Sequence, residues 1–327
     1  LLLETTQVEV MPLPPLAHIV VVRTFTNSTD RMVEAVLTLP PIAPQEVVYR
    51  LIVNIGGVEY HAFAQPGKRA RRAHDAAVAE GRRAILYELL MGGVQLISIA
   101  GIEPGAKVSV QIWSIRPLDR PEENRANLTI PLSAKKNAAI FSLSDVDALV
   151  TTSERHSASV SVSADFSSLL VRITGQPYGD QYLISSEEKG VECSTPICLH
   201  FVPVNGGTLD HREWHVDKPG GWEVTSERGI ETFRHPHNPG GTVVSDRDDW
   251  IFGSMQTLAG EVRVTAPLPT EGAQPNAGGL LEIAPNARAL RAFAAAGFVG
   301  SATPQTAAEV LLAANVLSRQ TSLAFIG

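Results

Sequence analysis

Hydrophobic and polar residues alternate along much of the first 132 positions, which is the pattern of β-strands with one buried face. The clearest runs are residues 17–26, 46–53, 58–64 and 108–113. Gly56-Gly57 separates two of these runs and predicts a hairpin turn. Short strands at regular intervals, with turn residues between them, predict an antiparallel β-sandwich for this part of the chain.

One stretch interrupts the alternation. Residues 67–80 carry alanines at helical spacing with charged residues between them, which predicts a helix. Gly81 is a suitable end for it, because the residue after a helix often has a positive φ and glycine has no Cβ to oppose that conformation. Two apolar runs follow, 84–91 and 94–99, and Gly92-Gly93 between them predicts another hairpin.

The order of these motifs resembles the VIT domain (vault protein, inter-alpha-trypsin inhibitor heavy chain). The matching positions follow the family's basic helix, its G-x-x-A-x-L-x-E segment and its P-G turn before an alternating strand. They are Lys68, Ala70, Arg71, His74, Ala77, Gly81, Ala84, Leu86, Glu88, Ile102, Pro104, Gly105, Val108, Val110 and Pro117-Leu118. The resemblance covers residues 1–132 and implies a mainly β fold, an antiparallel sandwich with one helix.

A second β unit is expected over residues 133–266, because several of its segments alternate, 158–164 most clearly. Residues 267–327 are expected to form a linker, two Ala/Leu-rich helices and a closing strand. Thr303-Pro304 predicts the start of the second helix, as N-cap and first helical position. The closing strand, 320–326, is expected to pair with an earlier sheet, because alone it would leave its backbone groups unpaired.

The end of the chain resembles the segment that follows the von Willebrand A domain in proteins that combine that domain with a VIT domain. The metal-binding D-x-S-x-S pattern of the von Willebrand A domain is absent from the sequence, and no stretch is long enough to hold that domain. Metal-dependent adhesion is therefore not expected of this chain.

Composition narrows the function classes. Hydrophobic residues make up 44% and charged residues 19%, which is typical of a globular protein. The net charge of −7 gives no reason to expect nucleic-acid binding, and no apolar run is long enough for a transmembrane segment. The first residues do not read as a signal peptide but also lack a start methionine, so a cytoplasmic protein and an exported one both stay open. Cys193 and Cys198 are the only cysteines and form either a local disulfide or two free thiols.

Histidine and tryptophan gather in residues 205–250, which read as loops and short strands. The histidines are a candidate zinc site, because imidazole nitrogens are common zinc ligands and two of them lie four residues apart. The alternative is that they are ordinary loop residues. The tryptophans are a candidate interaction surface, because clustered aromatic residues in loops are typical of binding sites. The candidate residues are His211, His215, His235 and His237, and Trp214, Trp222 and Trp250.

Two charged groups complete the candidates. Asp246, Asp248 and Asp249 have carboxylates that suit calcium, although a solvated turn explains them as well. The basic residues of the expected helix could bind phosphate or an acidic partner, or could simply be its polar face. These residues are Lys68, Arg69, Arg71 and Arg72, with Arg82 and Arg83 just beyond the helix.

The sequence contains no G-x-S-x-G, Walker A or G-x-G-x-x-G motif that would indicate nucleophilic or nucleotide chemistry. The leading hypothesis is therefore a non-enzymatic interaction or scaffold protein with an unidentified protein partner and no cofactor. The alternative is a zinc-dependent enzyme, or an accessory subunit of one, that uses the histidines. The oligomeric state is left open.

Overall fold

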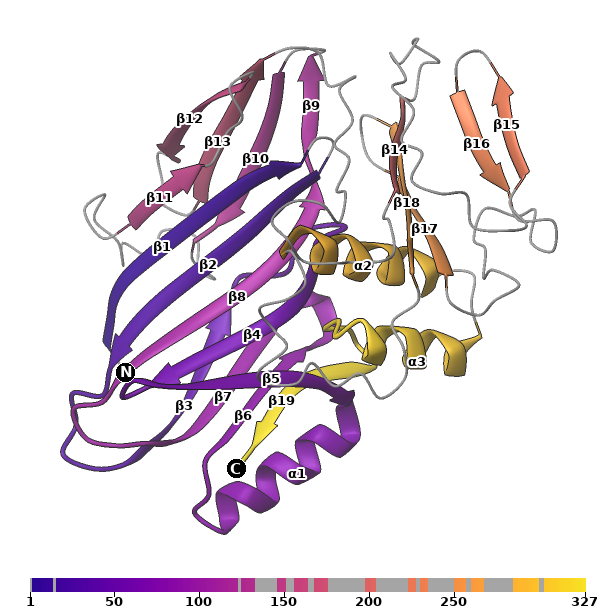
Figure 1. Ribbon diagram of the computed structural model, residues 1–327. Coiled ribbons are helices and arrows are strands. Elements are labelled where there is room, and N and C mark those ends of the chain that lie inside the picture. The colour runs from indigo at the N-terminus through magenta and orange to yellow at the C-terminus, as the bar shows by residue number, and fades with distance from the viewer. Residues whose placement is uncertain are drawn as a thin grey trace, which may run out of the picture.

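The structure is a computed structural model that describes residues 2–13, 16–122, 125–132, 146–150, 156–163, 168–175, 198–203, 223–227, 230–234, 250–256, 260–267, 285–299 and 303–327. Its largest element is a ten-stranded sheet with the order β11-β1-β2-β8-β4-β5-β19-β6-β7-β3 (Figure 1). The strands are β1 (Leu2–Leu13), β2 (Leu16–Thr26), β3 (Val33–Leu39), β4 (Val47–Ile55), β5 (Val58–Pro66), β6 (Ala84–Leu89), β7 (Gln95–Ile102), β8 (Lys107–Pro117), β11 (Val146–Val150) and β19 (Thr321–Ile326). Neighbouring strands are antiparallel except β1 and β11, which are parallel.

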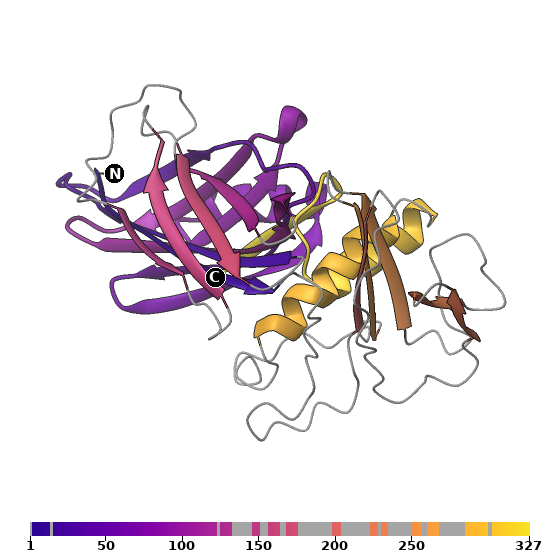
Figure 2. The same ribbon diagram turned by 90° about the horizontal axis from the view of Figure 1, so that it is seen from above.

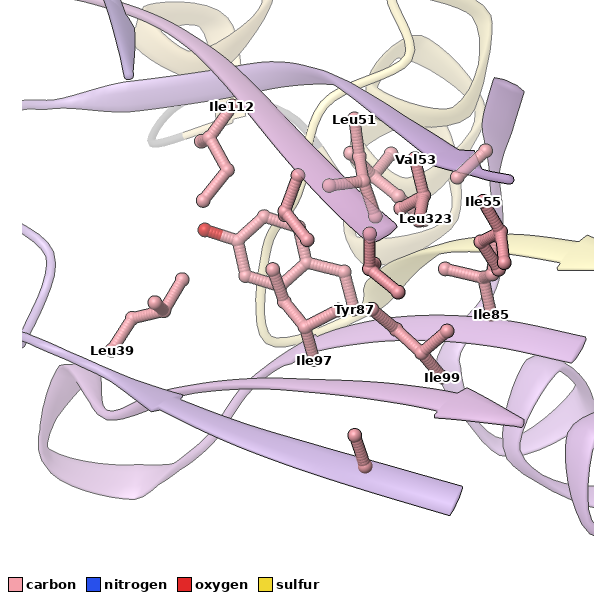
Figure 3. Packing of buried hydrophobic residues seen from close by; sticks show 14 of the residues in the cluster. Leu39, Leu51, Val53, Ile55, Ile85, Tyr87, Ile97, Ile99, Ile112 and Leu323 are labelled. Atoms are coloured by element: carbon pink, nitrogen blue, oxygen red, sulfur yellow. The ribbon is translucent and has the colours of Figure 1, made fainter. Parts of the chain in front are cut away.

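This sheet curls until its two halves face each other across a hydrophobic core. Leu51 and Val53 from β4 point toward Tyr87 from β6 and Ile97 and Ile99 from β7 (Figure 3). Each of these side chains is fully buried. The predicted mainly β sandwich is therefore confirmed, and a single bent sheet builds it.

A second core lies at the other end of the curled sheet. There a four-stranded sheet, in the order β12-β13-β10-β9, packs against β1 and β2. Its strands are β9 (Asp119–Glu122), β10 (Arg125–Pro131), β12 (His156–Val162) and β13 (Ser168–Gly175). Val8, Ile19, Leu128 and Val171 are among the buried residues of this second core.

The strand β19 comes from the C-terminal end of the sequence and lies inside the large sheet (Figure 1). Leu323 is opposite Ala64 of β5 on one side and opposite Tyr87 of β6 on the other. Without β19, β5 and β6 would each present an unpaired edge to the other. The predicted closing strand and its pairing with an earlier sheet are confirmed.

The helix predicted in the N-terminal part is α1 (Gly67–Ala79), which contacts β19, β6 and β5. Gly81 follows it with a φ of +70°, as its role as a helix stop requires. A single 3-10 turn, η1 (Met91–Gly93), connects β6 to β7, and Gly92 and Gly93 have φ values of +75° and +79°.

The remaining elements lie beside the curled sheet. A three-stranded sheet has the order β14 (Cys198–Pro203), β18 (Gly260–Pro267) and β17 (Trp250–Gln256), and β15 (Glu223–Glu227) pairs with β16 (Ile230–Arg234). The helix α2 (Pro285–Phe298) runs between this three-stranded sheet and strands β4 and β8 (Figures 1 and 2). The helix α3 (Pro304–Ala313) begins as expected, with the Thr303 hydroxyl accepting a hydrogen bond from the Thr306 amide at 3.3 Å.

The pairings cross the three segments expected from the sequence, because β1 pairs with β11, β10 with β13, and β19 with β5 and β6. The division at residues 132 and 266 stays a prediction. In the part of the chain that the structure describes, no helix is long and apolar enough to cross a bilayer.

Candidate interaction surface

The helix α1 rests on the curled sheet through one narrow face. Ala70, His74 and Ala77 are buried and lie at positions i, i+4 and i+7, on one side of the helix. Ala70 packs against Leu86 and Ala324, so the small alanine side chains let the helix lie close to β6 and β19. The opposite face of α1 is consequently turned toward solvent.

That solvent face carries the four basic residues predicted from the sequence. Lys68, Arg69, Arg71 and Arg72 are all exposed. Arg71 forms an ion pair with Glu88 on β6, and its Nε donates to Glu88 Oε1 at 3.1 Å. Arg71 therefore helps to hold α1 on the sheet, whereas Lys68, Arg69 and Arg72 have no carboxylate partner among the described residues.

These three residues, together called the cationic surface below, stand in an unfavourable electrostatic setting. They occupy the first two turns of α1, where the helix dipole is positive, and the first turn contains no acidic residue. Lys68 and Arg72 are four positions apart and Arg69 and Arg72 three, so these pairs of like charges are neighbours on the helix. An anionic partner at this place would be favoured by the side chains and by the helix dipole together.

Arg82 and Arg83, which follow the helix, are engaged within the protein. Arg82 pairs with Glu80 at 2.7 Å and donates to the carbonyl of Gly327. Arg83 donates to the Tyr60 hydroxyl and to the carbonyl of Gly101, both at 2.7 Å. These contacts leave Arg82 and Arg83 with structural roles, separate from the cationic surface.

The four histidines of the predicted zinc site, His211, His215, His235 and His237, lie outside the described residues. Trp214 and Trp222 and the aspartates at 246, 248 and 249 also lie outside them. Trp250 begins β17, but its side chain is outside the description. The zinc, calcium and tryptophan-surface expectations therefore stay predictions. Within the described ranges, no group of three or more His, Cys, Asp or Glu side chains is arranged to hold a metal ion.

The prediction for the two cysteines also remains untested. Cys198 begins β14, while Cys193 lies outside the described residues. The choice between a disulfide and two thiols stays open.

Sequence reasoning did not single out a group of buried charges inside the curled sheet. Arg23 on β2 and Arg116 on β8 are each 7% exposed, and Glu46 lies just before β4. Arg23 has the same parity along its strand as Ile19 and Phe25, both buried residues of the inner face. In the sequence, the sign that such a residue is buried is a charged residue at a position where the alternation calls for an apolar one.

A second buried polar group lies on β2, β4 and β8. His18 Nε2 and the Tyr49 hydroxyl are 2.7 Å apart, and the His18 and Trp113 rings have centroids 5.5 Å apart. Burial lowers the pKa of His18 to about 4 and raises the pKa of Tyr49 above its ordinary value. His18 is therefore neutral at physiological pH, and its hydrogen bond with Tyr49 is a structural one.

Comparison with known proteins gives one family match. Residues 3–113 match the family described as the Vault protein inter-alpha-trypsin domain. The matched segment runs from β1 into β8 and includes α1, so the cationic surface belongs to it. No curated protein matches the chain.

Among solved structures, the chain is similar to an M1 zinc metallopeptidase from Deinococcus radiodurans, with 12% identity and a TM-score of 0.26 over 54% of this chain and 40% of that one. A mutant of that peptidase bound to a Tyr-Ser-Ala substrate gives 11% identity and a TM-score of 0.26 over 62% of this chain and 44% of that one. The chain thus spans less than half the length of these structures. Likenesses at this level carry no conclusion about fold or activity.

Proposed function

We propose that the chain is a non-enzymatic protein-interaction or scaffold protein that binds an acidic segment of a protein partner at the cationic surface of α1. The match of residues 3–113 to the Vault protein inter-alpha-trypsin domain supports this proposal. The observation that carries this proposal is the exposure of Lys68, Arg69 and Arg72 at the positive end of a helix, with no carboxylate paired to them in the described part of the chain.

Electrostatics further supports this assignment. The chain as a whole has a net charge of −7, so a concentrated positive patch is a local departure from its overall charge. Such a patch steers an acidic segment toward one place on the molecule while the remaining surface repels it. Arg319 adds a further exposed cation at this end of α1, because its neighbour Gln320 accepts a backbone hydrogen bond from Gly67 at 2.9 Å.

The experiment compares three forms of the chain as bait for proteins from the native host. They are the wild type, a surface variant with Lys68→Gln, Arg69→Gln and Arg72→Gln, and a control with Arg31→Gln, Lys107→Gln and Arg172→Gln. The control removes three exposed positive charges from other elements and so matches the change in net charge. The proposal expects one protein that is retained by the wild type and the control and lost with the surface variant.

Two further measurements make the result specific. Chemical cross-links between the chain and the retained protein should map to α1 and to an acidic segment of the partner. Binding of an isolated glutamate-rich peptide, followed by fluorescence anisotropy, should weaken about tenfold or more in the surface variant and should fall as salt is raised. Equal retention by the surface variant and the control would refute the assignment of the interaction to α1.

A further inference from the structure

A small polar cavity, partly open to solvent, lies at the junction of the two hydrophobic cores. Ile19 and Ile130 line it from the side of the four-stranded sheet, and Leu39, Val48 and Ile112 line it from the other side. Its volume is about 50 Å³. Polar residues from three strands and from the start of β4 reach the same space, and they are Arg23, Glu46, Gln95, Ser114 and Arg116.

Arg23 is the residue that makes this cavity unusual. Its side chain is 7% exposed and lines the cavity, yet it has no hydrogen bond and no ion pair among the described residues. Burial lowers the pKa of the Arg23 guanidinium to about 10, which still leaves it positively charged at neutral pH. The guanidinium is largely removed from solvent and has no counter-charge among the described residues, so a bound anion would stabilise it.

The other charges of the cavity do not supply that anion. Glu46 Oε1 accepts a hydrogen bond from the Ser114 hydroxyl at 2.7 Å, and its Oε2 accepts one from the Ala43 amide at 3.3 Å. Oε2 is also 3.9 Å from Arg116 Nη1. Glu46 is therefore engaged at both oxygens and pairs with Arg116, so the cavity is left with a net positive charge that belongs to Arg23.

The polar wall around Arg23 is also built from fixed groups. The Gln95 amide donates to the carbonyl of Pro40 at 2.5 Å, and its oxygen accepts a hydrogen bond from the buried Tyr87 hydroxyl. Tyr87 is fully buried in the first core, so it fixes the orientation of Gln95 from behind. The cavity is therefore preorganised, with little side-chain freedom to lose when it takes up a ligand.

We propose that this cavity is a binding site for a small oxyanion, a carboxylate or a phosphate, that pairs with the guanidinium of Arg23. The guanidinium presents planar, paired N–H donors that match the oxygens of either group. The 50 Å³ is the space open to the centres of water molecules, and one water needs roughly 10–15 Å³ of such space. The cavity therefore has room for about three to five water molecules, which favours an ion of a few heavy atoms. This site is separate from the cationic surface, and the two proposals stand or fall independently.

The test measures binding of inorganic phosphate and of acetate to the whole chain by equilibrium dialysis, at constant ionic strength. The expected result is one anion bound per chain, and comparison of the two ions shows whether the site takes a tetrahedral or a planar oxyanion. In Arg23→Met, which keeps an unbranched side chain but removes the charge, affinity should fall about tenfold or more, because a charge-assisted pair is lost.

Three control variants assign the binding to the cavity. Arg172→Met makes the same substitution at an exposed arginine of β13 and should leave affinity unchanged. The Lys68→Gln, Arg69→Gln and Arg72→Gln variant should also retain the bound anion, because its charges lie on the far side of α1. Arg23→Lys keeps the charge without the paired donors, and we expect it to fold and to bind more weakly than the wild type.

The proposal is overturned if the wild type binds neither ion, or if Arg23→Lys and Arg23→Met both bind as tightly as the wild type. It is also overturned if the Lys68→Gln, Arg69→Gln and Arg72→Gln variant no longer binds the anion while Arg23→Lys binds it as tightly as the wild type. Should Arg23→Met fail to fold, binding of either ion to Arg23→Lys as tightly as to the wild type overturns the proposal.

Discussion

Asn27 joins two turns through a single buried side chain. Its Nδ2 lies 3.0–3.1 Å from the carbonyl oxygens of Arg31, Ile102 and Glu103, and its Oδ1 accepts a hydrogen bond from the Thr29 amide at 3.1 Å. Asn27 is 1% exposed, so these contacts replace water for the whole amide. The residue holds the end of β2 against the turn that connects β7 to β8.

Replacing this amide by a carboxylate should be severe. In Asn27→Asp a negative charge would face three carbonyl oxygens, so we expect the free energy of unfolding to fall by about 3 kcal/mol, measured by urea denaturation. Ser28→Asp adds the same charge at the exposed neighbouring position and should change it by less than about 0.5 kcal/mol. Equal effects of the two substitutions would show that the hydrogen bonds of Asn27 do not stabilise the contact between β2 and the turn that connects β7 to β8.

The buried His18 predicts a pH dependence of stability. Its pKa is lowered by burial from 6.5 to about 4, so between these pH values the unfolded chain binds a proton that the folded protein does not. The free energy of unfolding should therefore decrease as the pH is lowered through this range, by up to about 3 kcal/mol. Urea denaturation at a series of pH values measures the slope.

Two variants attribute the slope to His18. His18→Gln has no titrating group and should lose most of the pH dependence. Tyr49→Phe removes the hydroxyl near Nε2 but keeps the burial that lowers the His18 pKa, so the slope should persist. An unchanged slope in His18→Gln would assign the acid sensitivity to other groups.

The structural roles of His18 and Arg23 were not predicted from the sequence, and the reason is physical. Alternation shows which positions share a face of a strand, but the first five residues of β2, Leu16 to Val20, are all buried, so burial there does not distinguish the two faces. Arg23 could have been suspected from its apolar neighbours at the same parity, whereas its missing counter-ion depends on contacts between strands far apart in the sequence.

At the scale of elements, the placement of β19 in the large sheet can be tested by substitution of one buried side chain, Leu323. Leu323 is 0% exposed and packs in the first core between β5 and β6. Leu323→Ala should lower the free energy of unfolding by about 2–5 kcal/mol, because it opens a cavity at the centre of the sandwich. The same substitution at Leu170 of β13, which is 39% exposed, should cost less than about 1 kcal/mol. Similar costs at both positions would contradict the placement of β19.

The elements with strong local signals were predicted well. Gly81 and Thr303 mark helix boundaries through backbone and side-chain chemistry within a few residues, and both predictions are confirmed. The closing strand was also predicted, but its two neighbours were not. Pairing between β19 and the β5 and β6 edges depends on which edges are left open after the rest of the sheet has formed, and no local pattern encodes that choice.

At the scale of the whole molecule, metal content distinguishes the proposed interaction role from the zinc-dependent alternative. The proposed interaction role expects less than stoichiometric zinc or calcium in the purified, chelator-free chain, measured by elemental analysis. Stoichiometric zinc that is lost in His211→Ala/His215→Ala would instead favour the zinc-dependent alternative and would locate its ligands. The residues concerned lie outside the described part of the chain, so composition and spacing were the only guides to them.

The position of β19 also delays completion of the large sheet until the end of this sequence has been translated. Roughly 230 residues separate the end of β6 from the start of β19. At translation rates of about 5–20 residues per second, the gap between β5 and β6 stays unfilled on the ribosome for roughly ten to fifty seconds. During that interval the nascent domain exposes two open strand edges, which are the surfaces that ribosome-associated chaperones protect from aggregation.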